Sequence, residues 1–354
     1  MKDRILSIDF FRGFIMFLLI AETTGLYYHT GWTQMIHHPW HGLRFWDLIQ
    51  PFFMFIVGVA MPVSLARRQA KGINYGMNFK HIAKRCLILL AMGTGLQCVY
   101  SRKLVWELWN VLTQLSVTII ITYLLIRLKP SLQFAISLCI LAASDAAYRF
   151  FPLEGFDQPF VIDKNFGTWM DLILMGKINQ GGGWVAVNCI PTAAHTIWGA
   201  IAGQILLNQS ITKFNKLKLM SIYGIALLIV GYGFDLAGIS PIIKRISTLS
   251  FVIVSGGWAF LALAFCFWIV DVARQTQIVK PFAVIGVNSI LIYLLTQSIG
   301  AQWFNGCVNV FLGGFMETLG CAKLIRSITV SLAILAMEWL FCLYLYRKSI
   351  FVKV

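Results

Sequence analysis

Three histidines within five positions form the densest group of proton-transfer side chains in this chain. The surrounding stretch adds two tryptophans and a carboxylate, so the group comprises His37, His38, Trp40, His41, Trp46 and Asp47. Imidazole titrates near neutral pH and can act as a base or carry a transferred group. The alternative is an interfacial loop with an aromatic belt, in which the histidines only tolerate both phases.

The histidine spacing does not favour a metal site. His37 and His41 are four positions apart, as two ligands on one helix would be, but Pro39 lies between them. The H-E-x-x-H signature is absent, as are a G-x-S-x-G motif, a P-loop and a dinucleotide fingerprint. We therefore expect proton or group transfer by the histidines without a metal.

Two carboxylates could assist a histidine. Asp47 begins an apolar segment, where the helix dipole favours a carboxylate in the first turn, but it could equally orient an imidazole. Glu22 lies near the outer end of the first apolar segment, and an ionisable residue in such a segment usually faces a cavity or a partner. We predict His37, Asp47 and Glu22 as the catalytic residues.

The composition sets the environment in which these residues act. Of the 354 residues, 58% are hydrophobic and only 12% are charged, and the mean hydropathy is +0.76. Because a soluble domain holds roughly 25% charged residues, the chain is predicted to be an integral membrane protein. The net charge of +15 comes from short basic clusters between apolar segments, a pattern typical of membrane topology and not of a nucleic-acid-binding face.

The apolar segments predict an all-α, polytopic protein with one transmembrane domain over residues 1–354. The basic start before the first segment resembles a signal peptide, but no small-x-small site follows Ala21, so we expect the first helix to be retained. About ten helices are predicted, each long enough to cross a bilayer or nearly so. They cover residues 8–28, 47–66, 80–100, 107–127, 131–148, 191–208, 219–237, 247–271, 282–300 and 324–346.

The distribution of Lys and Arg predicts the orientation. With the N-terminus in the cytoplasm, inner segments hold nineteen of the 29 basic residues and outer segments ten, which favours cytoplasmic N- and C-termini. The histidines then lie outside. The long connections, all on the outer side, are 28–46, 149–190 and 301–323, and we expect the middle one to cap an outer-facing cavity.

The remaining polar residues in apolar segments have structural interpretations as well. Asp9 and Arg12 share one helix face and could form an internal ion pair or bind an anion. We expect His195 to be a buried core histidine and Glu338 to form an interhelical hydrogen bond. The eight cysteines contain no C-x-x-C pair; Cys307 and Cys321 share an outer loop and could be bridged or free.

Five segments in order resemble the transmembrane acetyltransferase family of heparan-α-glucosaminide N-acetyltransferase and its bacterial relatives. The family patterns are D-x-F-R-G, H-A-x-W-N-G-L with a following D-L, V-L-Q-R-L, M-N-S-I-L and Y-R-K-K-I-F. The corresponding segments here are DFFRG at 9–13, HHPWHGL at 37–43 with DL at 47–48, VLTQL at 111–115, NSIL at 288–291 and YRKSIF at 346–351. Near the outer end of the first helix, where the family has an asparagine, this chain has Glu22.

The resemblance implies transfer of acetyl from cytoplasmic acetyl-CoA to an amino sugar across the membrane, with His37 central by its motif position. It implies a homodimer and a glucosamine-type acceptor. Basic side chains at the cytoplasmic mouth (Arg12, Arg85 and Lys84) would meet the phosphates of CoA. We predict that the cofactor site also includes Gln114, Asn288 and Ser289, although polar residues in such helices more often bridge helices. The predicted acceptor site comprises His38, Trp40, His41 and Trp46.

Other functions remain open at this stage. The acceptor could be a hydroxyl of a cell-envelope glycan, or the chain could be a sugar or proton transporter in which the histidines relay protons. Transporters often show repeats with matching broken helices, and none is evident here. The family's large luminal domain before the first helix is not seen in this chain, so we expect a bacterial inner-membrane protein with a periplasmic outer side.

Overall fold

The computed structural model describes residues 5–352 and is helical throughout, which confirms the predicted fold class. Within these residues no strand is present, and the single isolated β-bridge joins His41 to Ile243. Each of the ten predicted segments is helical. All eight cysteines are free, including Cys307 and Cys321.

The described residues divide into two compact units. Unit 1 contains residues 5–37, 44–49 and 266–352, and unit 2 contains residues 38–43 and 50–265. The boundary passes through the histidine stretch, between His37 and His38 and again between Leu43 and Arg44.

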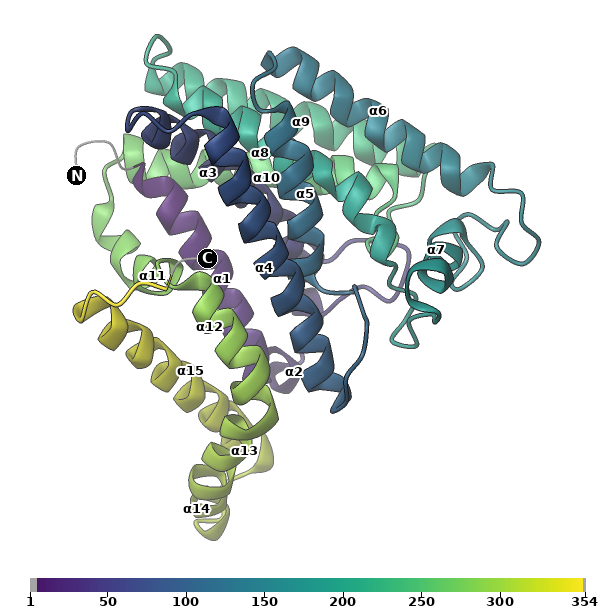
Figure 1. The fold of residues 1–354 in the computed structure, drawn as a ribbon. Helices are drawn as coiled ribbons and strands as arrows, with labels where there is room; N and C mark the ends of the chain where they lie inside the picture. The colour runs from purple at the N-terminus through teal and green to yellow at the C-terminus, as the bar shows by residue number, and fades with distance from the viewer. Residues whose placement is uncertain (1–4, 353–354) are drawn as a thin grey trace. The chain divides into compact units, whose positions relative to one another are not determined.

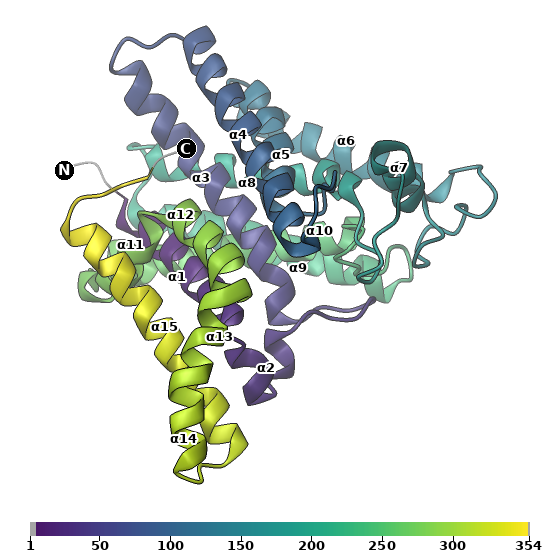
Figure 2. The same ribbon diagram turned by 60° about the horizontal axis from the view of Figure 1, so that its bottom comes forward.

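Unit 1 consists of two N-terminal helices and the C-terminal helices. Its helices are α1 (Leu6–Thr23), α2 (Leu26–Thr30), α11 (Val279–Gly286), α12 (Ser289–Leu295), α13 (Asn305–Val308), α14 (Gly314–Thr318) and α15 (Lys323–Arg347), with π-helical turns at Trp268–Val272, Thr296–Phe304 and Asn309–Gly313. The run from α12 to α14 lies beside α15 (Figures 1 and 2). Gly13 lets α1 approach α11, because a Cβ there would overlap the carbonyl of Phe282.

Unit 2 contains the other long helices and the long segment 149–190. Its helices are α3 (Ile49–Gln69), α4 (Tyr75–Ser101), α5 (Val111–Leu125), α6 (Pro130–Arg149), α7 (Phe166–Met175), α8 (Cys189–Leu207), α9 (Lys213–Leu236) and most of α10 (Leu249–Phe267). Figure 1 shows α4 and α5 side by side, and α8 packs against both α5 and α6. The centre of this unit is formed by α8, in which Ala193, Ala194 and Trp198 are fully buried.

Within residues 5–352, six helices are long and apolar enough to cross a membrane. They span residues 45–69, 75–101, 130–149, 213–236, 249–272 and 323–347, and the pair Thr276–Gly286 and Ser289–Thr318, bent by 56°, meets the same criteria when counted together. The other predicted segments are helical but shorter, more polar or, in α1, more charged. The protein is therefore a polytopic helical membrane protein; the count of ten spans and the cytoplasmic termini remain predictions.

Three predicted segments differ from the structure. The helix predicted over 282–300 is broken at Val287 and Asn288, between α11 and α12. The helix predicted over 8–28 is interrupted at Thr24 and Gly25, because Gly25 adopts a φ of +79° that a helix interior does not allow. The segment 301–323, predicted as a loop, is helical as far as Thr318. Its apolar residues continue the preceding helix, which ends where Gly320 takes a φ of +74°.

The close approach of α3 and α8 gives a prediction for stability. A Cβ on Gly199 would overlap the carbonyl oxygen of Phe55, and backbone atoms on both helices leave no flexible group to yield. Gly199→Ala is expected to destabilise the protein by about 1–3 kcal/mol through overpacking. Thermal unfolding of the purified protein in detergent measures this change.

The matched control is Gly233→Ala on α9, where a Cβ would meet no atom within 4 Å. There, alanine should be neutral or raise the melting temperature, because glycine costs up to about 1 kcal/mol in a helix. Equal melting temperatures for the Gly199→Ala variant and the wild type would contradict the packing argument.

Candidate functional site

The most defined polar pair in the histidine stretch is His37 and Asp47 in unit 1. His37 Nδ1 lies 2.9 Å from Asp47 Oδ1. The Asp47 side chain is 1% exposed, whereas that of His37 is 39% exposed. The Asp47 carboxylate is therefore buried, and the His37 imidazole is partly exposed.

Backbone geometry fixes the position of Asp47. It lies in the 3₁₀ turn Phe45–Leu48, three residues after Arg44, and its Oδ2 accepts the backbone N–H of Arg44 at 3.0 Å. The N–H of Asp47 returns a bond to the Arg44 carbonyl at 3.0 Å. Asp47 is thus both a carboxylate in the first helical turn and a hydrogen-bond partner of His37.

Two further side chains hold the His37 segment. The Arg44 guanidinium donates to the His37 carbonyl at 3.1 Å, and Gln34 Oε1 accepts the N–H of Phe45 at 3.1 Å. Sequence reasoning missed both residues as contributors. The spacing of Arg44 and Asp47, three residues apart at the start of a helix, is the capping signal that could have indicated the first of them.

A buried tryptophan ring lies near the His37 imidazole. The Trp46 ring is buried, with its centroid 6.4 Å from that of His37 and 5.3 Å from that of Tyr27. Tyr27 in turn donates its hydroxyl to the carbonyl of Leu18 on α1 at 3.2 Å. The predicted acceptor residue Trp46 therefore contacts the packed interior of unit 1.

The His37–Asp47 pair determines which imidazole nitrogen is reactive. An ionised carboxylate can only accept, so the contact requires a proton on Nδ1 and leaves the lone pair on Nε2. A neutral imidazole held in this tautomer is suited to abstract a proton or to attack a carbonyl carbon. The arrangement is that of a base oriented by a carboxylate.

The next part of the histidine stretch is anchored within unit 2. His41 Nε2 lies 2.8 Å from Asp235 Oδ1, and Gly42 donates its N–H to the Ile242 carbonyl at 2.8 Å. Asp235 also accepts the N–H of Ile242 at 2.9 Å. Asp235 is 194 positions from His41, so no local sequence signal could have identified it.

Trp40 and His38 complete this anchored segment. Trp40 donates its indole N–H to the Phe160 carbonyl at 2.8 Å, which links residues 38–43 to the predicted outer segment 149–190. The His38 ring lies so close to Gly42 that it would overlap a Cβ there. Gly42 also has a φ of +132°, which residues with a side chain rarely adopt. The predicted acceptor residues are thus distributed over both units, with Trp46 in unit 1 and His38, Trp40 and His41 in unit 2.

Gln114, predicted to bind cofactor, belongs to a buried chain of amides in unit 2. It accepts a hydrogen bond from Gln50 on α3 and donates to Asn188 Oδ1 at 2.6 Å. Asn188 then donates to the Arg245 carbonyl at 3.2 Å. Gln114 therefore bridges helices, the alternative that its type and position suggested.

Asn288 also has a structural role. It lies at the break between α11 and α12, where its Nδ2 donates to the Ile350 carbonyl and its Oδ1 accepts the Val352 N–H, both at 2.9 Å. The adjacent Ser289 is the first residue of α12. Both ends of the Asn288 amide are engaged by the backbone of the C-terminal segment.

The other predicted residues are placed as follows. Arg12 is half-buried on α1, and Glu22 is exposed in the last turn of that helix, in the same unit as His37. Arg85 is half-buried on α4 and Lys84 beside it is exposed, both in unit 2. His195 is fully buried, with Nε2 2.8 Å from Ser255 Oγ, which confirms the interpretation as a core histidine. The described residues contain no group of three metal-ligating side chains.

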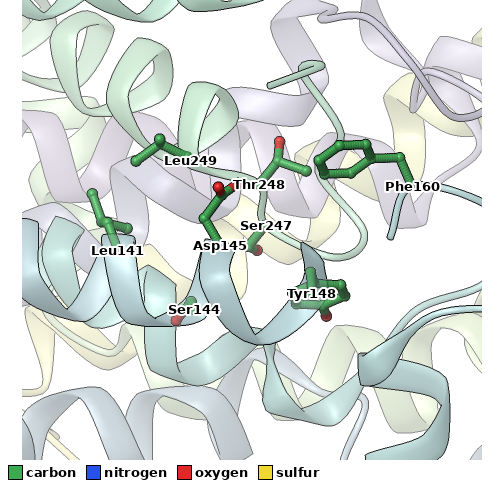
Figure 3. Close-up of a pocket in the computed structure, with 8 residues that line it drawn as sticks. All are labelled: Leu141, Ser144, Asp145, Tyr148, Phe160, Ser247, Thr248 and Leu249. Atoms are coloured by element: carbon green, nitrogen blue, oxygen red, sulfur yellow. The ribbon is translucent and has the colours of Figure 1, made fainter. Parts of the chain in front are cut away.

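A small pocket lies in unit 2, between the C-terminal half of α6 and residues 247–249 (Figure 3). Asp145, Tyr148 and Phe160 contribute to its lining. The Asp145 carboxylate is paired with Arg149 at 2.5 Å, so it stabilises the end of α6. None of the predicted site residues lines this pocket.

Asp171 on α7 is a buried carboxylate of the outer segment 149–190. Its oxygens accept the Trp109 indole N–H at 2.7 Å and the Ala186 N–H at 2.8 Å. Burial raises its pKa from 3.8 to about 6, although both hydrogen bonds act in the opposite direction. Asp171 therefore joins three parts of the outer region and changes charge near pH 6.

This pKa predicts a pH dependence of stability. A folded-state pKa above the unfolded value means that the contribution of Asp171 is full below about pH 4 and is lost as the pH rises through about 6. The difference corresponds to about 3 kcal/mol. Melting temperatures between pH 4 and 7 should decline less for Asp171→Asn than for the wild type. Parallel curves would contradict the assignment.

Comparison with known proteins agrees with the sequence motifs. The family model described as heparan-alpha-glucosaminide N-acetyltransferase, catalytic, matches residues 4–233, about two thirds of the chain. This region includes α1, the histidine stretch and the α4–α5 pair. A search of curated proteins found no match. The chain belongs to the family of the heparan-α-glucosaminide N-acetyltransferase catalytic domain, a family of transmembrane acetyltransferases.

Proposed function

We propose that this protein transfers acetyl from cytoplasmic acetyl-CoA to the amino group of a glucosamine-type sugar on the outer side of a bacterial inner membrane. The observation that supports this most directly is the 2.9 Å contact between His37 Nδ1 and the buried Asp47 carboxylate. It orients a half-exposed imidazole through its Nδ1, and the motif resemblance assigns the family's histidine to His37. A general base of this kind is what acyl transfer to an amine requires.

In the proposed reaction the acceptor amine is neutral when it attacks the thioester carbonyl. His37 Nε2 takes the proton that the amine loses as the new C–N bond forms. The C–S bond breaks, and His37 returns that proton to the leaving thiolate, so the imidazole ends the cycle neutral. Asp47 stabilises the imidazolium during the cycle and preserves the tautomer.

The two other predicted groups have supporting roles in this proposal. Glu22, exposed at the end of α1, would bind the acceptor's amino group. Arg12, on the same helix, would bind a CoA phosphate by charge-assisted hydrogen bonds. Attack by Nε2 itself, giving an acetyl-histidine that the acceptor then cleaves, uses the same geometry.

The test is acetyl transfer from radiolabelled acetyl-CoA to glucosamine by the purified protein in detergent. Labelled product that resists alkaline hydroxylamine identifies an amide and supports the proposal, whereas product cleaved by hydroxylamine is an ester and identifies a hydroxyl acceptor. Absence of both product and CoA binding would contradict the proposal and favour transport. CoA binding without product would require a different acceptor, sought among cell-envelope glycans.

A further inference from the structure

Glu338 on α15 is a carboxyl group inside the membrane-spanning part of the protein. The helix covers Lys323–Arg347 and meets the criteria for a membrane span. Glu338 is nine residues before Arg347 and fifteen after Lys323, which at the helical rise places it about 13 Å and about 22 Å from these basic ends. With its two basic ends at the surfaces of a hydrocarbon core of about 30 Å, this helix places the Glu338 backbone inside that core.

The side chain faces protein. Glu338 is 7% exposed, its Oε2 is buried without a hydrogen-bond partner, and among the described residues it forms no hydrogen bond or ion pair. The interhelical hydrogen bond expected from sequence is therefore absent among these residues. An ionised carboxylate in such surroundings would have neither water nor a cation to compensate its charge.

The helix segment opposite Glu338 has unusual geometry. A Cβ built on Gly300 would lie 3.4 Å from Glu338 Oε1 and 3.4 Å from the Leu295 carbonyl oxygen. Gly300 belongs to the π-helical run Thr296–Phe304, and π-helical turns are rare and concentrate at functional positions. The Glu338 carboxyl group therefore lies within van der Waals range of this π-helical turn.

The charged groups on the neighbouring elements do not pair with Glu338. The run Thr296–Phe304 contains no titratable residue, and on α15 itself Cys342, one turn away, is fully buried. The other elements packed against α15 carry titratable groups: Asp9, Arg12 and Glu22 on α1, Tyr27, Tyr28 and His29 on α2, Lys280 on α11, Cys307 on α13 and Glu317 on α14. None of them forms a hydrogen bond or ion pair with Glu338, so no cation among the described residues of this unit pairs with an ionised Glu338.

We propose that Glu338 is a membrane-embedded proton-binding site, protonated in the resting protein at neutral pH, facing the π-helical turn at Gly300. It is separate in the chain from the His37–Asp47 pair and does not depend on the acetyl-transfer proposal. The protonated form fits the enclosed site because it is neutral and offers an O–H donor to nearby backbone carbonyls.

Dicyclohexylcarbodiimide tests this proposal, because it is apolar and reacts with protonated carboxyls. The carboxylic O–H adds across one C=N bond, the proton goes to nitrogen, and rearrangement gives a stable N-acylurea with no leaving group. At pH 7 an ordinary glutamic acid is protonated in only about one molecule in 500. Peptide mass spectrometry should show Glu338 labelled at least about 100-fold faster than Glu317, which is 69% exposed.

Two variants sharpen the test. Glu338→Gln should remove the adduct from this peptide while the protein remains folded, since the amide resembles the neutral acid. Gly300→Ala is the matched control and should keep the adduct, because the new methyl would lie 3.4 Å from the carboxyl oxygen, an ordinary van der Waals contact that leaves Glu338 in place.

Infrared spectroscopy decides the matter independently of reagent access. The carbonyl band of a protonated carboxylic acid should be present at pH 7 in the wild type and missing in Glu338→Gln. A carboxylate band that disappears in Glu338→Gln would overturn the proposal, as would equal labelling of Glu338 and Glu317. A protein inactive in acetyl transfer would give the same labelling and spectra, so this test is distinct from that of the proposed function.

Discussion

Replacing His37 by alanine is expected to lower the rate of acetyl transfer about 10²–10⁴-fold, the contribution typical of a positioned general base. His37 is half-exposed and lies outside the buried core, so the variant should fold. The loss should therefore fall on kcat with little change in the affinity for CoA. Initial rates with radiolabelled acetyl-CoA, alongside a direct CoA-binding measurement, separate these effects.

The matched control is His29→Gln. His29 is a half-buried histidine on α2 in the same unit, and its ring lies beside Gly25. This variant should retain a rate close to that of the wild type. If His37→Ala were as active as His29→Gln, His37 would not be the base, and the variants His38→Ala and His41→Ala would become the next measurements.

Replacing Asp47 by asparagine is expected to lower kcat about 10²–10⁴-fold, because the wrong imidazole tautomer then predominates. The asparagine carbonyl can still accept the Arg44 N–H, so the start of the helix keeps its cap. Its amide nitrogen, however, donates and would face His37 Nδ1. The proton then moves to Nε2, and the base loses its lone pair at the reacting position.

The pH profile distinguishes this role from a structural one. In Asp47→Asn the rate should be low at every pH, with an unchanged melting temperature. Glu317→Gln is the control, since that carboxylate is exposed and paired with Arg326 at 2.8 Å. A parallel fall in activity and melting temperature would indicate that Asp47 only stabilises the fold.

Much of the fold could be predicted because lipid constrains a helical membrane protein so strongly. Runs of apolar residues give every long helix, since a backbone in hydrocarbon must satisfy its hydrogen bonds within the segment. The helix predictions were wrong where hydropathy does not report the backbone conformation. The break at Gly25 depends on one positive φ. Residues 301–318 continue a helix, and their hydropathy pattern does not distinguish a helix from an apolar loop.

The sequence by itself determined the fold class, the family motifs and the prominence of the histidine stretch, because composition, hydropathy and residue type are local properties. It also placed Asp47 at the start of a helix. Only the tertiary structure decided that the Asp47 carboxylate meets His37 Nδ1, that His41 meets Asp235, and that Gln114 bridges helices. These contacts join side chains that are 10, 194 and 74 positions apart, and such distances in sequence are closed by packing, which no local pattern records.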